Sequence, residues 1–522
     1  MRNAKIQLPL WLCGLVGLLL GGLLLGAGAS IARADDGDAR ARYLVFVEPG
    51  EKDAFLPAAQ SLATFHGAEV VRFESSDLDQ VLETVRRHRP DHVAFVLPPS
   101  KIDVDLSHDI LELAVRVDDD PFVDFEYGFI TGRDGAAASA FVSRILRAHD
   151  HDYGRRASMF GSWEGQMGPM RAPMTAFAAM GFEAKSYYVR VHDEEPKRIE
   201  SARNAFQGMK GSDALLFFSH GYPDEMSFCF RAQDLRDWKV DLWPSILVNC
   251  ACYNGAPGRW YAPGRGGPED KGRVDPKVSV ALQILDAGVP AYVAGVDPWH
   301  GLLANQVFDL IVGEGMRLGE ATKRMFDRLA LEFWPERIDF PPTAEHRLRF
   351  SGEGTNNRRH NGGGMILFGD PAFAPFERDD RRAYSDLAVG KDGSLRVRMG
   401  TKPLVDGGPG EDFMIPMNVV LDYYSVKSAQ NLMQQLGIEL HRVVRFDADA
   451  AAVPALTVSK ARCGKEDVRT KEPQCLFEER RDGRYLHVRL PLAEPWFPPG
   501  LWPGKISQHG LSVELEGRLG ES

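Results

Sequence analysis

A chain of 522 residues is too long to be built around one hydrophobic core, and ordinary domain sizes predict about three domains. Hydrophobic residues make up 44% of the chain and charged residues 26%, which excludes wholesale disorder. The formal net charge of −11, with basic residues scattered along the chain, argues against nucleic acid as a partner.

The N-terminus has the pattern of an export signal. Basic residues come first, an apolar run follows at 8–25, and Ala32-Arg33-Ala34 then offers a small-x-small cleavage site. We therefore predict a signal peptide at 1–34 and an exported mature chain, periplasmic or secreted. The apolar run is also nearly long enough to cross a bilayer, so an uncleaved membrane anchor is the alternative.

Residues 35–150 are expected to form a first α/β lobe. Short apolar runs alternate there with amphipathic stretches, which is typical of βα units around a parallel sheet. Strands are predicted at 43–47, 69–73 and 92–97, and helices at 53–66, 78–88 and 136–148. The acidic, aromatic stretch at 118–128 is either a solvated connector or a calcium-binding loop, because clustered carboxylates suit a hard cation.

Residues 151–376 are expected to form a second α/β lobe of the same parallel-sheet type. Strands are predicted at 157–161, 184–191, 214–218, 246–249, 289–295 and 365–368. Helices are predicted at 172–180, 198–209, 276–287, 302–312 and 319–333. Two Gly-rich stretches, 255–272 and 351–364, are predicted to be mobile surface loops.

Residues 377–522 lose the helical spacing and predict a small β-sandwich of the immunoglobulin-like type. Short alternating strands are expected at 394–399, 414–424, 438–446 and 485–490. Cys463 and Cys475 are close enough in sequence to close a small loop, and an oxidising compartment would favour a disulfide between them. Without Cys13 of the signal segment the cysteine count is odd, so at least one thiol stays outside an internal pair.

Two apolar strands end in reactive side chains. The run 214–218 leads into His220, and the run 246–249 leads into Cys252. Ligands bind beyond the carboxyl ends of parallel strands, so two such tips would bring an imidazole and a thiol to one edge. A histidine raises the thiolate fraction of a neighbouring cysteine and can protonate a leaving amine. The amides of Gly221 and Cys252 are candidates for an oxyanion hole.

At these residues the sequence resembles the gingipain family of cysteine peptidases, a branch of the caspase-like group. The matching motifs are Ser219-His220-Gly221, Ala251-Cys252 continuing to Tyr253-Asn254-Gly255, and Gly369-Asp370-Pro371 after a strand. The resemblance extends over about 43–375 and implies a caspase-like catalytic domain followed by a β-sandwich. It also implies Cys252 as nucleophile and His220 as base.

The resemblance also suggests residues around the dyad. Some gingipains add a glutamate in the context Ser-Ala-Glu-Gly, which Ser162-Trp163-Glu164-Gly165 matches, so Glu164 is a candidate to orient His220. A loop carboxylate is the competing interpretation. The acid that arginine-specific members carry beyond this motif is absent here, where Arg171 stands nearby, and arginine specificity is not implied. Trp299 falls near the family's aromatic pocket wall and could equally be a core or loop tryptophan.

The sequence therefore predicts an exported cysteine endopeptidase that takes a protein or peptide substrate. No redox or organic cofactor is implied, and a structural calcium ion is compatible with the acidic stretch. Cys250 could instead be the thiol that matters, or could pair with Cys252 and His220 around zinc, although two ligands from one strand end are weak support for such a site. The alternative from another class is a catalytically inactive caspase-like envelope protein that binds a protein partner. Self-processing at 255–272 is a third hypothesis.

Overall fold

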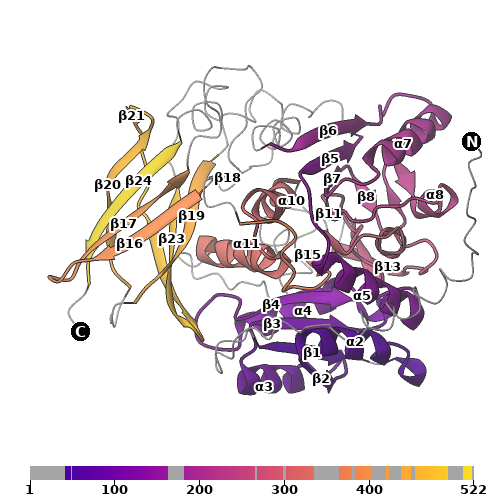
Figure 1. Cartoon of the computed structure of the whole chain (residues 1–522), viewed down its shortest axis with the longest axis horizontal. Coiled ribbons are helices and arrows are strands. Elements are labelled where there is room, and N and C mark those ends of the chain that lie inside the picture. Colours follow the sequence, from indigo (N-terminus) through magenta and orange to yellow (C-terminus); the bar gives the residue numbers. More distant parts are fainter. Residues whose placement is uncertain are drawn as a thin grey trace, which may run out of the picture. The chain divides into compact units, whose positions relative to one another are not determined.

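A ten-stranded sheet runs through both predicted α/β lobes (Figure 1). The computed structural model describes residues 42–48, 50–162, 181–264, 267–297, 301–333, 364–378, 383–401, 419–422, 437–447, 453–491 and 510–519. Across the sheet the strands are β2 (Glu69–Arg72), β1 (Tyr43–Val47), β3 (His92–Val96), β4 (Glu126–Ile130), β15 (Met365–Phe368), β14 (Ala291–Gly295), β11 (Ile246–Asn249), β7 (Ala214–Phe218), β5 (Arg156–Gly161) and β6 (Glu183–Tyr188). Most neighbours are parallel, and β15 runs antiparallel to β14. The chain is thus a mixed α/β protein, and the two lobes share one sheet.

The helices connect these strands in the way that a parallel sheet requires. They are α2 (Leu56–His66), α3 (Leu78–His88), α4 (Val104–Val115), α5 (Gly135–His149), α7 (Glu195–Met209), α8 (Ala232–Asp237), α9 (Val280–Asp286), α10 (Gly301–Phe308) and α11 (Leu318–Phe333), with 3-10 turns at Glu51–Asp53 and Pro99–Lys101 and a π-helical turn at Asp309–Gly313. Because β2 and β3 lie on opposite sides of β1, right-handed crossovers put α2 and α3 on opposite faces. Over the described ranges, no helix combines the length and apolar character needed to cross a bilayer.

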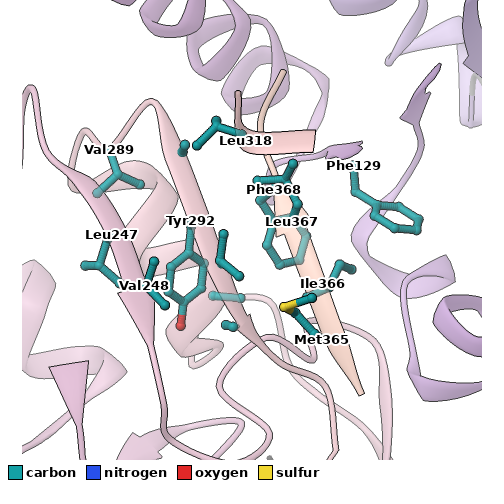
Figure 2. Packing of buried hydrophobic residues seen from close by; sticks show 14 of the residues in the cluster. Phe129, Leu247, Val248, Val289, Tyr292, Leu318, Met365, Ile366, Leu367 and Phe368 are labelled. Carbon is teal, nitrogen blue, oxygen red and sulfur yellow. The ribbon is translucent and has the colours of Figure 1, made fainter. Parts of the chain in front are cut away.

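The core explains why the middle strands read as unbroken apolar runs. Every residue of β1, β3, β4, β11, β14 and β15 is buried. Figure 2 shows side chains of β14 and β15 packed between those of β11 and Phe129 of β4. The rings of Tyr292 and Phe368 stack there with centroids 6.1 Å apart. Strands buried on both faces show no alternation, which is why apolar length predicted these strands, with the exception of β4, which begins with Glu126.

Two stretches between the predicted elements are more ordered than expected. The stretch 255–272, predicted to be a mobile loop, is largely an antiparallel hairpin of β12 (Arg259–Gly264) and β13 (Gly267–Arg273), with Arg259 paired to Asp270 across it. After β7, the short strands β8 (Gly221–Tyr222), β9 (Glu225–Met226) and β10 (Phe230–Arg231) form a small antiparallel sheet. Cross-strand pairing stabilises these segments although their sequences are polar and Gly-rich. The second predicted loop, 351–364, lies almost wholly outside the described residues.

The C-terminal part consists of two antiparallel sheets around one core. One sheet contains β16 (Ala383–Val389), β17 (Ser394–Thr401), β24 (Leu511–Arg518), β20 (Leu456–Cys463) and β21 (Glu466–Asp467). The other contains β18 (Val419–Asp422), β19 (Gly437–Arg445), β23 (Gly483–Pro491) and β22 (Gln474–Arg480). Apolar side chains of both sheets belong to one buried cluster, as in a β-sandwich. The immunoglobulin-like assignment stays a prediction.

The predicted disulfide between Cys463 and Cys475 is wrong. Both residues are thiols in the structure. Cys463 ends β20, which belongs to the five-stranded sheet, whereas Cys475 lies in β22 of the four-stranded sheet. Cys463 belongs to the buried cluster between the sheets and Cys475 packs against it, without a bridge between them.

The acidic stretch at 118–128 joins parts of the fold rather than standing as a solvated connector. Asp120 accepts hydrogen bonds from the backbone amides of Phe122 (2.8 Å) and of Glu479 in β22 (3.0 Å). The amide of Val123 donates to Asp327 of α11 (2.9 Å). The end of the stretch is the buried strand β4. Among described residues, no potential metal-binding group of three includes an acid of this stretch.

Candidate functional site

The register of β7 and β11 brings the two predicted reactive residues to equivalent positions. The strands are parallel neighbours, and Phe217 is paired with Asn249. His220 follows Phe217 by three residues, and Cys252 follows Asn249 by three. Both side chains thus come from the same edge of the sheet, immediately beyond adjacent strand ends. His220 is exposed and Cys252 is half-buried, so solvent reaches the site.

The chain just after His220 lies in close contact with the turn that carries Cys252. A Cβ atom on Gly221 would lie 2.8 Å from the Cβ of Ala251 and 2.9 Å from the carbonyl oxygen of Cys252. Real Cβ atoms do not come this close to their neighbours, so only glycine fits at 221. The residue that follows the histidine therefore packs directly against the turn that carries the cysteine.

Asn254 fixes the turn by hydrogen bonds to several segments. Its Nδ2 atom donates to the carbonyl oxygens of Tyr222 (2.5 Å) and Glu225 (2.9 Å). Its Oδ1 atom accepts from Nδ2 of Asn249 (3.0 Å), which also reaches the hydroxyl of Tyr292 (2.9 Å). Because these buried polar groups satisfy one another, the turn below Cys252 has a defined shape.

The residue after the nucleophile candidate has an unusual backbone conformation. Tyr253 has a φ angle of 59°, in the left-handed region that non-glycine residues rarely adopt. Its amide donates to the carbonyl oxygen of Asp297 (3.4 Å), and the next amide but one, that of Gly255, donates to Gly295 (2.7 Å). Such backbone strain costs on the order of 1–3 kcal/mol and is found at functional turns.

The burial of the other two nearby thiols distinguishes them from Cys252. Burial raises the pKa of Cys229 to about 12. Burial, with the neighbouring Cys252 as a second cause, also raises the pKa of Cys250 well above its usual value. Both thiols are therefore neutral at physiological pH and inaccessible. Within the described chain, no metal-capable group of three contains Cys250, Cys252 or His220, which leaves the zinc alternative without support.

Three of the predicted site residues lie outside the described residues: Glu164, Arg171 and Trp299. Ser162, the last described residue before Glu164, lies beyond β5, and its Oγ atom is 2.5 Å from Oγ of Ser219. The last described residue before Glu164 therefore lies next to the residue that precedes His220. The roles of the three residues stay predictions.

The structure adds an acid that the sequence did not single out. Asp297 follows β14, and burial, with Asp105 as a second cause, raises its pKa to about 7. Its charge also contributes, after burial, to the raised pKa of Tyr253. The position beyond the end of a neighbouring strand could have identified Asp297. Nothing in the sequence indicated that its carboxyl group is buried.

A cleft of ≈ 530 Å³ opens along the same edge of the sheet. The amide of Gly258, beyond β11, donates to the carbonyl oxygen of Ile102, beyond β3 (3.0 Å), so the carboxyl ends of these strands share an edge. The cleft is bordered by α4 residues and the β12–β13 hairpin, where Tyr261 donates to Asp105 (3.1 Å). Its lining includes Asp103, Asp105 and Asp109.

The known proteins that this chain resembles share little of its sequence. No family model and no curated protein matches it. Among solved structures it is similar to the separase of Saccharomyces cerevisiae in two crystal structures of the separase–securin complex, at 12% and 10% identity and TM-scores of 0.31 and 0.27. These matches cover 59% and 55% of this chain but only 18% and 17% of the separase chain. A solute-binding protein of an ABC transporter from Burkholderia graminis, in complex with D-arabinose, matches at 9% identity and a TM-score of 0.16, over 49% of this chain and 84% of that one. At these scores the likenesses carry no argument about activity.

Proposed function

We propose that this protein is a cysteine endopeptidase with a caspase-like, gingipain-type catalytic domain and a Cys252–His220 dyad. The observation that carries the proposal is the register of β7 and β11, in which His220 and Cys252 each stand three positions beyond the last residue that the two strands pair. The close approach of Gly221 to Ala251 and Cys252 supports it further, because it ties the two tips into one unit.

The proposed reaction follows from the chemistry of the two side chains. His220 takes the proton from the Cys252 thiol, and the sulfur attacks the carbonyl carbon of the scissile peptide bond. The amides of Gly221 and Cys252 are the proposed donors to the developing oxyanion. His220 then gives the proton to the leaving amine, and a thioester with Cys252 remains. Water hydrolyses the thioester, releasing the acid product and restoring the thiol.

The residues around the dyad are proposed to orient His220 and to select the substrate. Glu164 is the proposed orienting partner of His220, while Arg171 and Trp299 are proposed to line the pocket for the residue before the scissile bond. Since no acid stands where arginine-specific gingipains carry one, we propose a preference other than arginine at that position. Export through a cleaved signal at 1–34 is also part of the proposal, and the N-terminal mass of the mature chain would test it.

Cleavage of a peptide library by the purified mature chain tests the activity. The proposal expects cleavage that is abolished in Cys252→Ala and reduced at least 100-fold in His220→Ala. Cys250→Ala is the matched control. It removes a buried thiol two residues before Cys252 and should leave cleavage intact. Cleavage that survives Cys252→Ala would refute the proposed nucleophile. A chain that folds but cuts no peptide would favour the inactive protein that only binds a partner.

A further inference from the structure

A second cluster of chemically reactive side chains lies away from the candidate active site. Nε2 of His66 and Nε2 of His149 lie 2.7 Å and 2.8 Å from the same atom, Oδ2 of Asp370. The Asp370 side chain is fully buried, whereas 14% of the His66 side chain and 20% of the His149 side chain are exposed. The cluster joins the ends of α2 and α5 to the residues just after β15.

The second oxygen of Asp370 is already held by other groups. Its Oδ1 atom accepts from the hydroxyl of Tyr43 (2.9 Å) and from the amide of Ala372 (3.0 Å). Oδ2 is therefore the oxygen that faces both imidazoles. Such hydrogen bonding of a carboxylate through its other oxygen is what orients a metal ligand in proteins.

Neighbouring rings hold the two imidazoles in fixed orientations. His66 stacks on Tyr43 with ring centroids 4.0 Å apart and an angle of 8° between planes. His149 contacts the rings of Phe65 (4.8 Å) and Phe373 (4.7 Å). One potential ligand atom from each of the three residues lies within 4.8 Å of the other two, so the three ligands converge on one point.

A second cluster of potential metal ligands differs from this one because a lysine already supplies its positive charge. Asp327, Glu478 and His487 also converge, but the ammonium group of Lys323 lies 2.6 Å from Asp327 and 2.7 Å from Glu478. That lysine supplies the positive charge that a metal would bring. The cluster around Asp370 has imidazoles in that place, which can present either a proton or a lone pair.

We propose that His66, His149 and Asp370 bind a zinc ion that fastens α2 and α5 to the loop after β15. Two imidazoles and one carboxylate, with a fourth position for water, are a donor set that zinc takes. In a tetrahedral site with bonds of roughly 2.0–2.1 Å the donors stand roughly 3.4 Å apart, so each Nε2 needs to move about 0.6–0.7 Å farther from Oδ2 than its present 2.7 or 2.8 Å. The exposed part of each imidazole gives the ion a way in.

The position of this site indicates a structural role. Tyr43 begins β1, so the cluster lies at the amino ends of β1 and its parallel neighbour β3. The carboxyl ends of β3 and β11, beyond which Cys252 stands, are at the other edge. Zinc at Asp370 would thus stabilise the fold without touching the proposed dyad, and its test is independent of the peptidase proposal.

Zinc binding to the complete, chelator-treated chain tests the proposal. Titration calorimetry with zinc chloride is expected to show one equivalent bound, and added zinc is expected to raise the melting temperature by a few degrees. Cobalt(II) in its place should give the visible absorption of a bound ion. In His66→Gln and His149→Gln the affinity should fall at least tenfold, because the glutamine amide nitrogen can still donate to Asp370, whereas its carbonyl oxygen is a much poorer zinc ligand than an imidazole nitrogen.

Two controls keep the result decisive. His88→Gln removes a histidine at the end of α3 that lies 4.0 Å from Glu69, and it should bind zinc like the wild type. Cys252→Ala should also bind one equivalent of zinc. The proposal is overturned if the wild type binds no zinc, if the folded glutamine variants bind it unchanged, or if Cys252→Ala loses it. Should one glutamine variant fail to fold by circular dichroism, the other variant and the wild-type titration still decide.

Discussion

Gly221 is the residue on which the shape of the candidate site depends most directly. It follows His220 and packs against Ala251 and the carbonyl of Cys252, so it determines how near the imidazole and the thiol can come. Two further residues act with it. Asn254 bridges the histidine-bearing and cysteine-bearing segments by hydrogen bonds, and Tyr253 accepts a left-handed backbone to turn the chain after the cysteine.

Gly221→Ala is therefore expected to damage the site more than the fold. The added methyl group would collide with a neighbouring backbone, and overpacking of this kind costs about 1–3 kcal/mol of unfolding free energy. Peptide cleavage should fall at least tenfold, because the strand tips must separate. Gly154→Ala is the control, since its new methyl group would meet only the carboxyl end of Asp213, at 3.1 Å. Equal effects of the two substitutions on cleavage would contradict the role assigned to Gly221.

At the scale of elements, the sequence predicted best those strands that are buried on both faces. The bounds of β1, β7, β11 and β15 agree with the predicted ranges, because an apolar run between turn residues leaves little choice. The same apolar pattern predicted that His220 and Cys252 follow the ends of β7 and β11. The hydrogen bonds of Asn249 and Asn254 that frame these two residues could not be predicted from it, because Asn249 reaches Tyr292, and Asn254 reaches Tyr222 and Glu225, all distant in sequence.

The elements that sequence reasoning missed contain polar residues at buried positions. The strand β4 begins with Glu126, whose carboxylate pairs with Arg317 (2.7 Å) and lies 3.1 Å from Nδ1 of His92. The helix α4 buries Ser107 and His108 along with its apolar residues, which obscured its periodicity. Asp103, whose side chain accepts from the amide of Leu106 (2.9 Å), was the N-cap signal that could have revealed this helix.

The loop between α4 and β4 should make stability depend on pH. Burial, then the neighbouring Asp118, raises the pKa of Asp124 to about 9, and burial raises that of Asp120 to about 7. The folded state therefore keeps protons that the unfolded chain releases near pH 4. As the pH rises from about 4 to 9, these groups lower the unfolding free energy.

Asp124→Asn is expected to flatten this dependence. The amide needs no proton, so the variant should gain about 2 kcal/mol or more over the wild type at pH 8 and much less at pH 4.5. Urea denaturation at several pH values measures the difference. Asp119→Asn, an exposed neighbour, should leave the pH profile as it is. A gain for Asp124→Asn that is the same at both pH values would rule out the proton-linked explanation.

At the scale of the whole molecule, a buried charge network connects the large α/β sheet layer with the C-terminal strands. Lys323 of α11 bridges Asp327 and Glu478 of β22, and Glu478 also contacts Nε2 of His487 (2.7 Å). His487 in turn stacks on Phe122 of the acidic stretch, with ring centroids 3.8 Å apart. Burying charges stabilises little by itself, but removing one partner leaves the others uncompensated.

Lys323→Met should consequently destabilise the protein by about 3–5 kcal/mol, because the buried Asp327 would lose its cation and Glu478 would keep only the guanidinium of Arg480, at 2.7 Å. Thermal and urea unfolding measure the loss. Lys197→Met provides the comparison: it removes an exposed pair with Asp193 at 2.9 Å, and such pairs contribute less than about 1 kcal/mol. If Lys323→Met is no more harmful than Lys197→Met, the network does not hold these layers together.

The proposed peptidase depends on activation of the Cys252 thiol by His220, and the rate of alkylation by iodoacetamide as a function of pH measures this activation. Mass spectrometry would assign the label to its cysteine. Cys252 is expected to react selectively at neutral pH. His220→Ala is expected to slow its labelling at least tenfold and to move the rise in rate toward the pKa of an ordinary thiol, about 8.5. Labelling of Cys252 with the same rate and the same pH profile in wild type and His220→Ala would contradict this activation.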